Sequence, residues 1–181
     1  AEKLEVTDLI NSIKTGAEGT LIKSGAHLVV RMDEPPMEII GSSTALASAV
    51  NNLINNAVEA GATQVLLDVR KDARQVTLKI ADNGSGMSQE LTAKSFEPFY
   101  TTKSNGTGLG LAVVRSVVEA HQGQIGVVSA QGRGTCFTIT LPLVLPESKS
   151  KVETMNKDDA MNKDDAMNKD ESMNKDKDLA A

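Results

Sequence analysis

Apolar residues recur along the first 146 residues with different spacings, and each spacing predicts one kind of element. Spacings of three and four residues predict three helices, at 6–21, about 42–61 and about 108–122. Alternation or short apolar runs predict five strands, at 26–32, 65–69, 76–80, 124–130 and 135–141. This order predicts a layered α/β domain in which antiparallel hairpins replace a strict repeat of strand, helix and strand.

A segment rich in glycine, serine and threonine, at 82–110, separates the first hairpin from the third helix. Its periodicity is weak, apart from a possible short helix near 88–94. Irregular segments of this length are usually either functional or disordered. Both interpretations are open at this point.

The composition changes at Glu147, and the last 35 residues differ from the rest of the chain. They carry ten acidic residues, seven Lys and four of the seven Met, and they repeat a hexapeptide that begins MNKD. Six residues turn about 600° around a helix, so successive Met side chains do not form one face. We expect 1–146 to fold as one domain and 147–181 to be a low-complexity, disordered tail.

Charge in the first 146 residues is nearly balanced, with 12 basic and 14 acidic side chains, which gives no indication of nucleic-acid binding. Cys136 is the single cysteine, and no stretch approaches the roughly 18 consecutive apolar residues of a membrane span. The first residues lack a signal-peptide pattern and begin with Ala rather than Met. We expect a cytoplasmic protein, or a fragment of a longer one, without membrane contact.

A first group of candidate residues lies on the second predicted helix. Asn52 and Asn56 stand one turn apart on one face, and Glu59 follows three residues later. An amide oxygen can bind Mg²⁺ without adding negative charge beside phosphates, so this face suits a metal bound with a nucleotide. A polar, solvated helix face would give the same pattern.

A second group, DNGSG at 82–86, comes directly after a predicted strand. Asp82 could accept a hydrogen bond from an exocyclic amine, while Gly84 and Gly86 let the backbone approach a flat ligand. A simple turn is the alternative. A calcium loop is excluded, because the two glycines stand where oxygen ligands would be required.

A third group, GTGLGL at 106–111, leads into the third predicted helix, whose N-terminus is suited to bind phosphate. It is neither a Walker A loop nor a dinucleotide-binding fingerprint, since the required Lys and glycine spacings are missing. Three of the four aromatic residues fall in FEPFYTTK at 96–103, so we expect a hydrophobic plug that holds a mobile lid. Lys103 could reach phosphates from that lid or be solvated. GRGT at 132–135 could be only a hairpin turn.

In this order and spacing, the segments resemble the catalytic and ATP-binding domain of two-component sensor histidine kinases, in a wider group that includes gyrase and MutL. They correspond to its N box, G1 box, F box, G2 box and terminal GRGT, over about 6–142. The resemblance implies a Bergerat-type α+β sandwich, with a mixed sheet covered on one face by three helices and a flexible ATP lid. It also implies ATP and Mg²⁺ as cofactors.

The resemblance also assigns roles to individual residues. Asn56 would bind Mg²⁺, with Asn52 assisting as the second catalytic residue, and Asp82 would recognise the adenine amine. Gly84 and Gly86 would shape the base pocket. Further nucleotide contacts are implied for Lys103, Gly106, Thr107, Gly108, Leu109, Gly110 and Thr135.

Within the wider group, hydrolytic members resembling MutL place a Glu four residues before the metal-binding Asn, to activate water. This chain has Asn52 there, and an amide cannot accept a proton as a carboxylate can, which favours a kinase. Many members carry a basic residue at the position of Glu59 and an aromatic one at Ala60, and this chain has neither.

The phosphoacceptor motif of the family is not found in this sequence. His27 falls in a predicted strand and His121 at a helix end, so we interpret both as structural. The resemblance therefore implies a partner, a helical dimerisation domain that carries the acceptor histidine, and indirectly a response regulator. PFYTTK followed by GTGLGL most resembles the nitrogen-regulation branch, which signals to sigma-54-dependent activators. An ATP hydrolase and a nucleotide-gated binding module are the alternatives.

The composition of the tail gives a first prediction. Deletion of residues 147–181 should leave the unfolding temperature and the nucleotide affinity of the chain nearly unchanged, because the tail has little apolar surface to bury. Thermal unfolding and calorimetric titration of both forms test this. A clear drop in either quantity on deletion would mean that the tail docks on the domain.

Overall fold

The domain is built from four helices and seven strands in the part of the chain that the structure describes. The structure is a computed structural model that describes residues 2–104 and 106–145, so the expected low-complexity tail lies outside the described residues. The helices are α1 (Val6–Ser24), α2 (Ser43–Glu59), α3 (Gln89–Lys94) and α4 (Gly110–Ala120). The strands are β1 (Glu2–Glu5), β2 (His27–Met32), β3 (Glu38–Gly41), β4 (Gln64–Lys71), β5 (Gln75–Asp82), β6 (Gln124–Ser129) and β7 (Thr135–Pro142).

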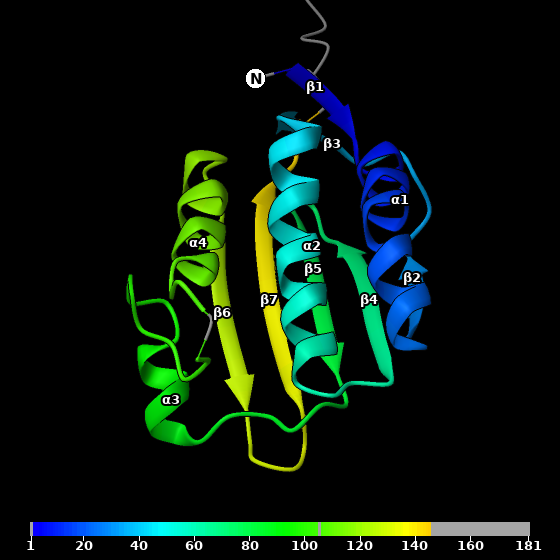
Figure 1. The fold of residues 1–181 in the computed structure, drawn as a ribbon. Coiled ribbons are helices and arrows are strands. Elements are labelled where there is room, and N and C mark those ends of the chain that lie inside the picture. The colour runs from blue at the N-terminus through cyan, green and yellow to red at the C-terminus, as the bar shows by residue number, and fades with distance from the viewer. Residues whose placement is uncertain (1, 105, 146–181) are drawn as a thin grey trace, which may run out of the picture. The chain divides into compact units, whose positions relative to one another are not determined.

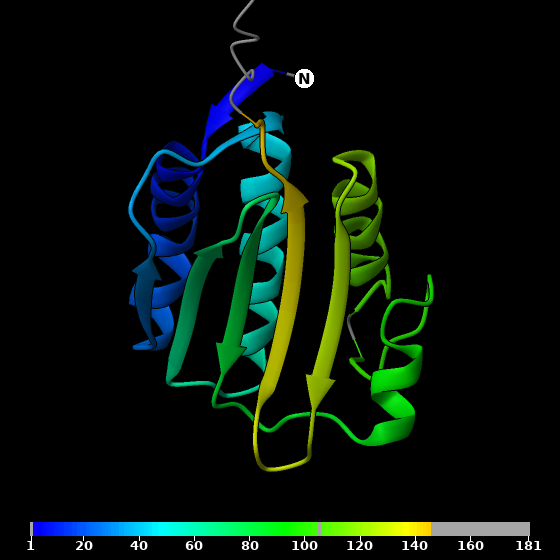
Figure 2. The same cartoon turned by 180° about the vertical axis from the view of Figure 1, so that it is seen from behind.

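Five of the strands form one mixed sheet, in the order β2-β4-β5-β7-β6. β2 and β4 run parallel, because α2 lies between them in the chain, and the other neighbours pair antiparallel. α1, α2 and α4 lie side by side on one face of this sheet (Figure 1), and no described helix covers the other face (Figure 2). The predicted mixed sheet with three helices on one face is confirmed.

The core lies between the sheet and these helices. Alternate residues of the central strands point toward the helices and are buried, as the period of two predicts. The buried strand residues are Val65, Leu67, Val69, Val76, Leu78, Ile80, Phe137, Ile139 and Leu141. α2 buries Leu46, Val50, Leu53, Ile54 and Ala57 against them. The position of α2 on the sheet is therefore fixed by one apolar face, which leaves its other face to carry polar residues.

The ends of α2 follow from residues with known preferences for helix termini. Ser42 precedes the helix, and its hydroxyl oxygen accepts a hydrogen bond from the Ala45 amide at 3.3 Å. After the last turn, the amide of Ala62 donates to the carbonyl of Ala57 at 3.0 Å. Both ends lie within a residue or two of the predicted boundaries, so the sequence places the polar face of α2 correctly.

A second, two-stranded sheet was not predicted. β1 pairs antiparallel with β3, from Glu2 opposite Gly41 to Glu5 opposite Glu38. The Glu5 carboxylate accepts a hydrogen bond from the Met37 amide at 3.1 Å, and the Val6 amide donates to the Met37 carbonyl at 2.8 Å. Each strand has four residues, which is too short for a period of two to stand out from the sequence.

His121 has the structural role that the sequence predicts. Its Nε2 accepts a hydrogen bond from the Ser42 amide at 3.0 Å, and its Nδ1 lies 2.7 Å from the Val117 carbonyl oxygen. The ring therefore links the end of α4 to the start of α2. His27 lies on an exposed position of β2. Within the described residues, no helix has both the length and the apolar character needed to cross a bilayer.

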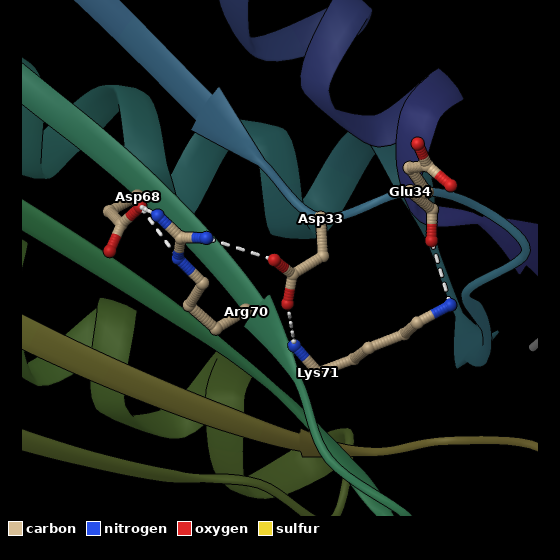
Figure 3. A network of polar contacts seen from close by, with 5 residues as sticks. All are labelled: Asp33, Glu34, Asp68, Arg70 and Lys71. Atoms are coloured by element: carbon tan, nitrogen blue, oxygen red, sulfur yellow. Dashed lines mark hydrogen bonds and ion pairs between the residues drawn. The ribbon is translucent and has the colours of Figure 1, made fainter.

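A network of polar contacts joins β4 to the segment that follows β2 (Figure 3). The Arg70 guanidinium lies 2.9 Å from both the Asp33 and Asp68 carboxylates, and the Lys71 amide donates to Asp33 Oδ2 at 2.9 Å. The Lys71 ammonium donates to the carbonyls of Glu34 and Pro36. The backbone hydrogen bond from Lys71, with the Arg70 side chain, holds the pKa of Asp33 below its ordinary value of 3.8.

The lowered pKa of Asp33 gives a pH-dependent prediction. Its charged form is favoured in the folded state, so Asp33 contributes stability above pH 3.8 that is lost as the pH falls through its folded-state pKa. Asp33→Asn should lower the unfolding temperature at pH 7, and this difference should shrink as the pH falls below that value. Glu18→Gln, on the exposed face of α1, is the control. An equal effect of Asp33→Asn at pH 7 and at pH 3 would contradict the assignment.

Candidate functional site

A polar stripe runs along α2 on the side away from its buried face. Asn52 and Asn56 are half-buried, and Glu59 is exposed at the end of the helix. The Nδ2 of Asn52 donates a hydrogen bond to the Gly110 carbonyl at 3.2 Å. The stripe therefore faces the N-terminus of α4, so the helix positions predicted for the metal and for the phosphates lie next to each other.

The segment between α3 and α4, which we call the lid, contributes the Lys103 ammonium to this stripe. The Lys103 ammonium donates a hydrogen bond to Asn56 Oδ1 at 3.3 Å and also contacts the Glu59 carboxylate. Lys103 thus lies over α2, and its contact with phosphates stays a prediction. The contact also shows that the amide oxygen of Asn56 is accessible to a cation.

No side chain of the described residues caps the N-terminus of α4. Its N-cap residue, Leu109, makes no side-chain hydrogen bond to the helix, and the Leu109 amide itself lies 3.4 Å from the Thr107 hydroxyl. Uncapped amides at the positive end of a helix favour an anion. Gly106, Thr107 and Leu109 are exposed around this end, so the backbone here is accessible to a phosphate group.

The expected aromatic plug is only partly correct. Phe96 packs edge-on against Phe137, with ring centroids 6.2 Å apart, and the Arg115 guanidinium lies 5.2 Å from its centroid. Phe99, in contrast, is 76% exposed. Phe99 has a φ of 64°, and its amide donates a hydrogen bond to the Gly108 carbonyl, so its side chain points away from the core. Gly108 has a φ of 70°, and a Cβ there would clash with the Phe99 backbone.

Asp82 lies at the end of β5, where two amides orient its carboxylate. Oδ1 accepts hydrogen bonds from the Gly84 amide at 2.8 Å and from the Thr135 amide at 3.3 Å. Within the described residues, no hydrogen bond reaches Oδ2. A carboxylate that is fixed through one oxygen can accept a hydrogen bond from a ligand amine through the other.

The loop after β5 packs tightly against the turn between β6 and β7. The amide of Gly132 donates to the Ser85 carbonyl at 2.7 Å, and Ser129 Oγ accepts from the Met87 amide at 2.8 Å. The two segments come closest at Gly86 and Gly134. A Cβ on Gly134 would be 1.9 Å from the Asp82 carbonyl oxygen. The GRGT turn is therefore more than a hairpin, because Gly134 packs against the Asp82 backbone and the Thr135 amide donates to the Asp82 carboxylate.

The structure also shows residues of this region that the sequence interpretation missed. Ser129 holds the Met87 amide and contacts the Thr135 hydroxyl at 2.8 Å, yet a serine in a strand carries no distinctive sequence signal. Asn83 has a structural role within DNGSG, since its Oδ1 accepts from the amides of Thr63 and Gln64. Asn83 thereby fixes the turn between α2 and β4.

Comparison with known proteins places this arrangement in a family. Residues 41–145 match the family model described as "Histidine kinase-, DNA gyrase B-, and HSP90-like ATPase". Sporulation kinase B of Bacillus subtilis is 40% identical over 116 residues, which are 62% of this chain and 27% of that protein. The chain thus spans about a quarter of the length of this curated relative.

Two solved structures have a similar fold. The mycobacterial sensor histidine kinase MprB matches with a TM-score of 0.68 at 30% identity, over 80% of this chain and 99% of that one. The structure of full-length ShkA in complex with AMPPNP matches with a TM-score of 0.70 at 26% identity, over 80% of this chain and 31% of that one. Both similarities extend over most of the folded domain.

The contact between Gly134 and Asp82 gives a testable prediction with a matched control. Gly132 and Gly134 both have positive φ, of 74° and 82°, but nothing lies within 4 Å of a Cβ on Gly132. Gly132→Ala should cost about 1 kcal/mol of folding stability, from backbone strain alone. Gly134→Ala adds a backbone clash and should cost about 3 kcal/mol or more. Chemical denaturation measures both, and equal losses would mean that the approach to Asp82 is relaxed in solution.

Proposed function

The chain belongs to the family of histidine kinase-, DNA gyrase B- and HSP90-like ATPases, and from that premise we propose that it binds Mg-ATP and transfers the γ-phosphoryl group to a histidine of a separate helical domain. The observation that carries this proposal is the juxtaposition of the α2 stripe with the uncapped N-terminus of α4. Neutral amide oxygens beside an anion-binding helix end suit a metal and a triphosphate together.

The donor set of this site fits the two cofactors. Asn56 offers Mg²⁺ an amide oxygen that already contacts the Lys103 ammonium. Asp82 offers the adenine amine a carboxylate oxygen, next to Gly84 and Gly86. The residues we assign to the phosphates and the lid are Lys103, Gly106, Thr107, Gly108, Leu109 and Gly110, with Thr135 beside the base. When bound, Mg²⁺ would neutralise charge on the triphosphate.

The hydrogen bond of Asn52 favours phosphoryl transfer over hydrolysis. Its Nδ2 donates to the Gly110 carbonyl, whereas an ionised carboxylate in this place would face that carbonyl without a proton to donate. Asn52 therefore holds α4 against the stripe and does not accept a proton from water. Transfer to a neutral imidazole needs positioning and charge neutralisation, which these residues supply.

The acceptor histidine is proposed to lie outside this chain. Both ring nitrogens of His121 are engaged within the fold, and His27 is part of β2. The matched residues make up only 27% of Sporulation kinase B, so that relative has room for a helical dimerisation domain outside the matched part. We assign the reaction to the cytoplasm and to a two-component pathway, with a response regulator as the indirect partner. A sigma-54-dependent activator is the regulator type that the lid motifs favour.

Asn56→Ala should lower the affinity for Mg-ATP by about tenfold or more, which corresponds to roughly 1.4 kcal/mol. The unfolding temperature should change little, because the Asn56 side chain contacts only Lys103 within the described hydrogen bonds. Calorimetric titration of nucleotide with and without Mg²⁺ measures the effect. Asn55→Ala is the matched control, since Asn55 is a half-buried neighbour on α2 that lies off the stripe. Equal losses in both variants would argue against a metal at Asn56.

Phosphoryl transfer is tested by adding a histidine-bearing helical dimerisation domain of a sensor histidine kinase to this chain with labelled Mg-ATP. The label should reach the histidine of that domain with the wild-type chain and not with Asn56→Ala. Steady phosphate release by the chain alone, abolished by Asn52→Ala, would instead show an ATP hydrolase. Nucleotide binding without transfer or release would show a binding module, and either result would overturn the kinase proposal.

A further inference from the structure

One ammonium group touches two oxygens of α2. Lys103 Nζ lies 3.3 Å from Asn56 Oδ1 and at the same time contacts Glu59 Oε2. Asn56 and Glu59 are three residues apart, so their side chains leave the same side of the helix. Because a single nitrogen contacts both atoms, the amide oxygen and the carboxylate oxygen border one position of a size suited to a cation.

We propose that Glu59 binds the magnesium ion that accompanies the nucleotide, beside Asn56, and that the Lys103 ammonium holds this position when the metal is absent. The inference rests on the proposed function, since it requires Asn56 to be the magnesium ligand. It adds an acidic partner to a site whose other helical contributors, Asn52 and Asn56, are neutral.

The chemistry of magnesium supports an acidic partner at this position. Mg²⁺ is usually held by one or two carboxylates together with substrate phosphates and several waters, rather than by a cage of protein ligands. Within the described residues, no group of three or more acidic, His or Cys side chains could hold a metal. One carboxylate and one amide, completed by phosphate oxygens and water, match this pattern. Glu59 is also 55% exposed, which leaves room for a hydrated ion.

A purely stabilising role does not account for the contact between Glu59 and Lys103. The two side chains are 55% and 48% exposed, and ion pairs at such exposure contribute little to stability. Lys103 and Mg²⁺ cannot both lie against Asn56 Oδ1, because two cations so close together repel each other. The ammonium therefore has to leave this oxygen when the metal binds, and it then lies near the phosphates.

The two possible roles of Glu59 predict opposite effects of Glu59→Gln. If Glu59 binds the metal, the variant needs more Mg²⁺ to bind nucleotide. If Glu59 only holds Lys103, the variant frees the ammonium, and the Mg²⁺ requirement stays the same or falls. The Mg²⁺ concentration for half-maximal binding of AMPPNP, measured by calorimetric or fluorescence titration, separates these outcomes without any measurement of catalysis.

We expect Glu59→Gln to raise the half-maximal Mg²⁺ concentration by about tenfold. Metal-free AMPPNP binding should not weaken, because the variant removes a negative charge beside the triphosphate. Glu119→Gln is the matched control, since Glu119 is an exposed helical glutamate of α4 paired with Arg115 at 3.3 Å. Mn²⁺ in place of Mg²⁺ gives a spectroscopic readout of the metal affinity of the nucleotide complex. That affinity should fall in Glu59→Gln and rise in Lys103→Met, which lacks the competing ammonium.

Failure of this inference can be told apart from failure of the proposed function. If Asn56→Ala raises the Mg²⁺ requirement while Glu59→Gln leaves it unchanged or lowers it, Glu59 does not bind the metal and the proposed function stands. If Asn56→Ala also leaves the requirement unchanged, the metal site itself is misplaced and both proposals fail. A lower Mn²⁺ affinity in Lys103→Met would overturn the role given to the ammonium.

Discussion

The burial of one face of α2 against the sheet is the constraint on which the rest of the structure depends. Leu46, Val50 and Leu53 are almost completely removed from water on the buried rows of β4, β5 and β7. This packing fixes the rotation of the helix, and rotation decides where the opposite face points. Asn52, Asn56 and Glu59 consequently face the lid and α4. The stability of the core and the geometry of the site thus have the same physical origin, the period of a single helix.

The opposite end of the site depends on a close backbone contact rather than on a helix face. Asp82 ends β5, and its orientation comes from the amides of Gly84 and Thr135, which belong to different strands and turns. Such convergence requires the β6–β7 turn to approach the Asp82 backbone more closely than any side chain would allow. The carboxylate that we propose for base recognition is therefore held at the end of a core strand, and core strands open least readily in a folded domain.

Elements with long, regular periods could be predicted from the sequence, whereas contacts made across the fold could not. α2 and the hairpin β4–β5 follow from hydrophobic spacing, and Ser42 follows from capping preference. The sheet of β1 and β3 has too few residues for a period to emerge. Ser129 acts through its contact with the Met87 amide, 42 positions away, and Phe99 is turned outward where its amide hydrogen-bonds to the Gly108 carbonyl. These depend on tertiary placement, which no local pattern encodes.

The acidic and the basic side chains of the site come from different kinds of elements. The sheet and α2 hold Asp82 and Glu59, which are acidic, while the cation Lys103 comes from the segment between α3 and α4. The rigid part of the site therefore repels a triphosphate unless positive charge arrives with it or from the lid. In the proposed function, magnesium supplies that charge with the nucleotide, and the contact of Lys103 with Glu59 keeps this cation close to the proposed phosphate position. A lid that carries the cation can thus couple its own position to the charge of the nucleotide.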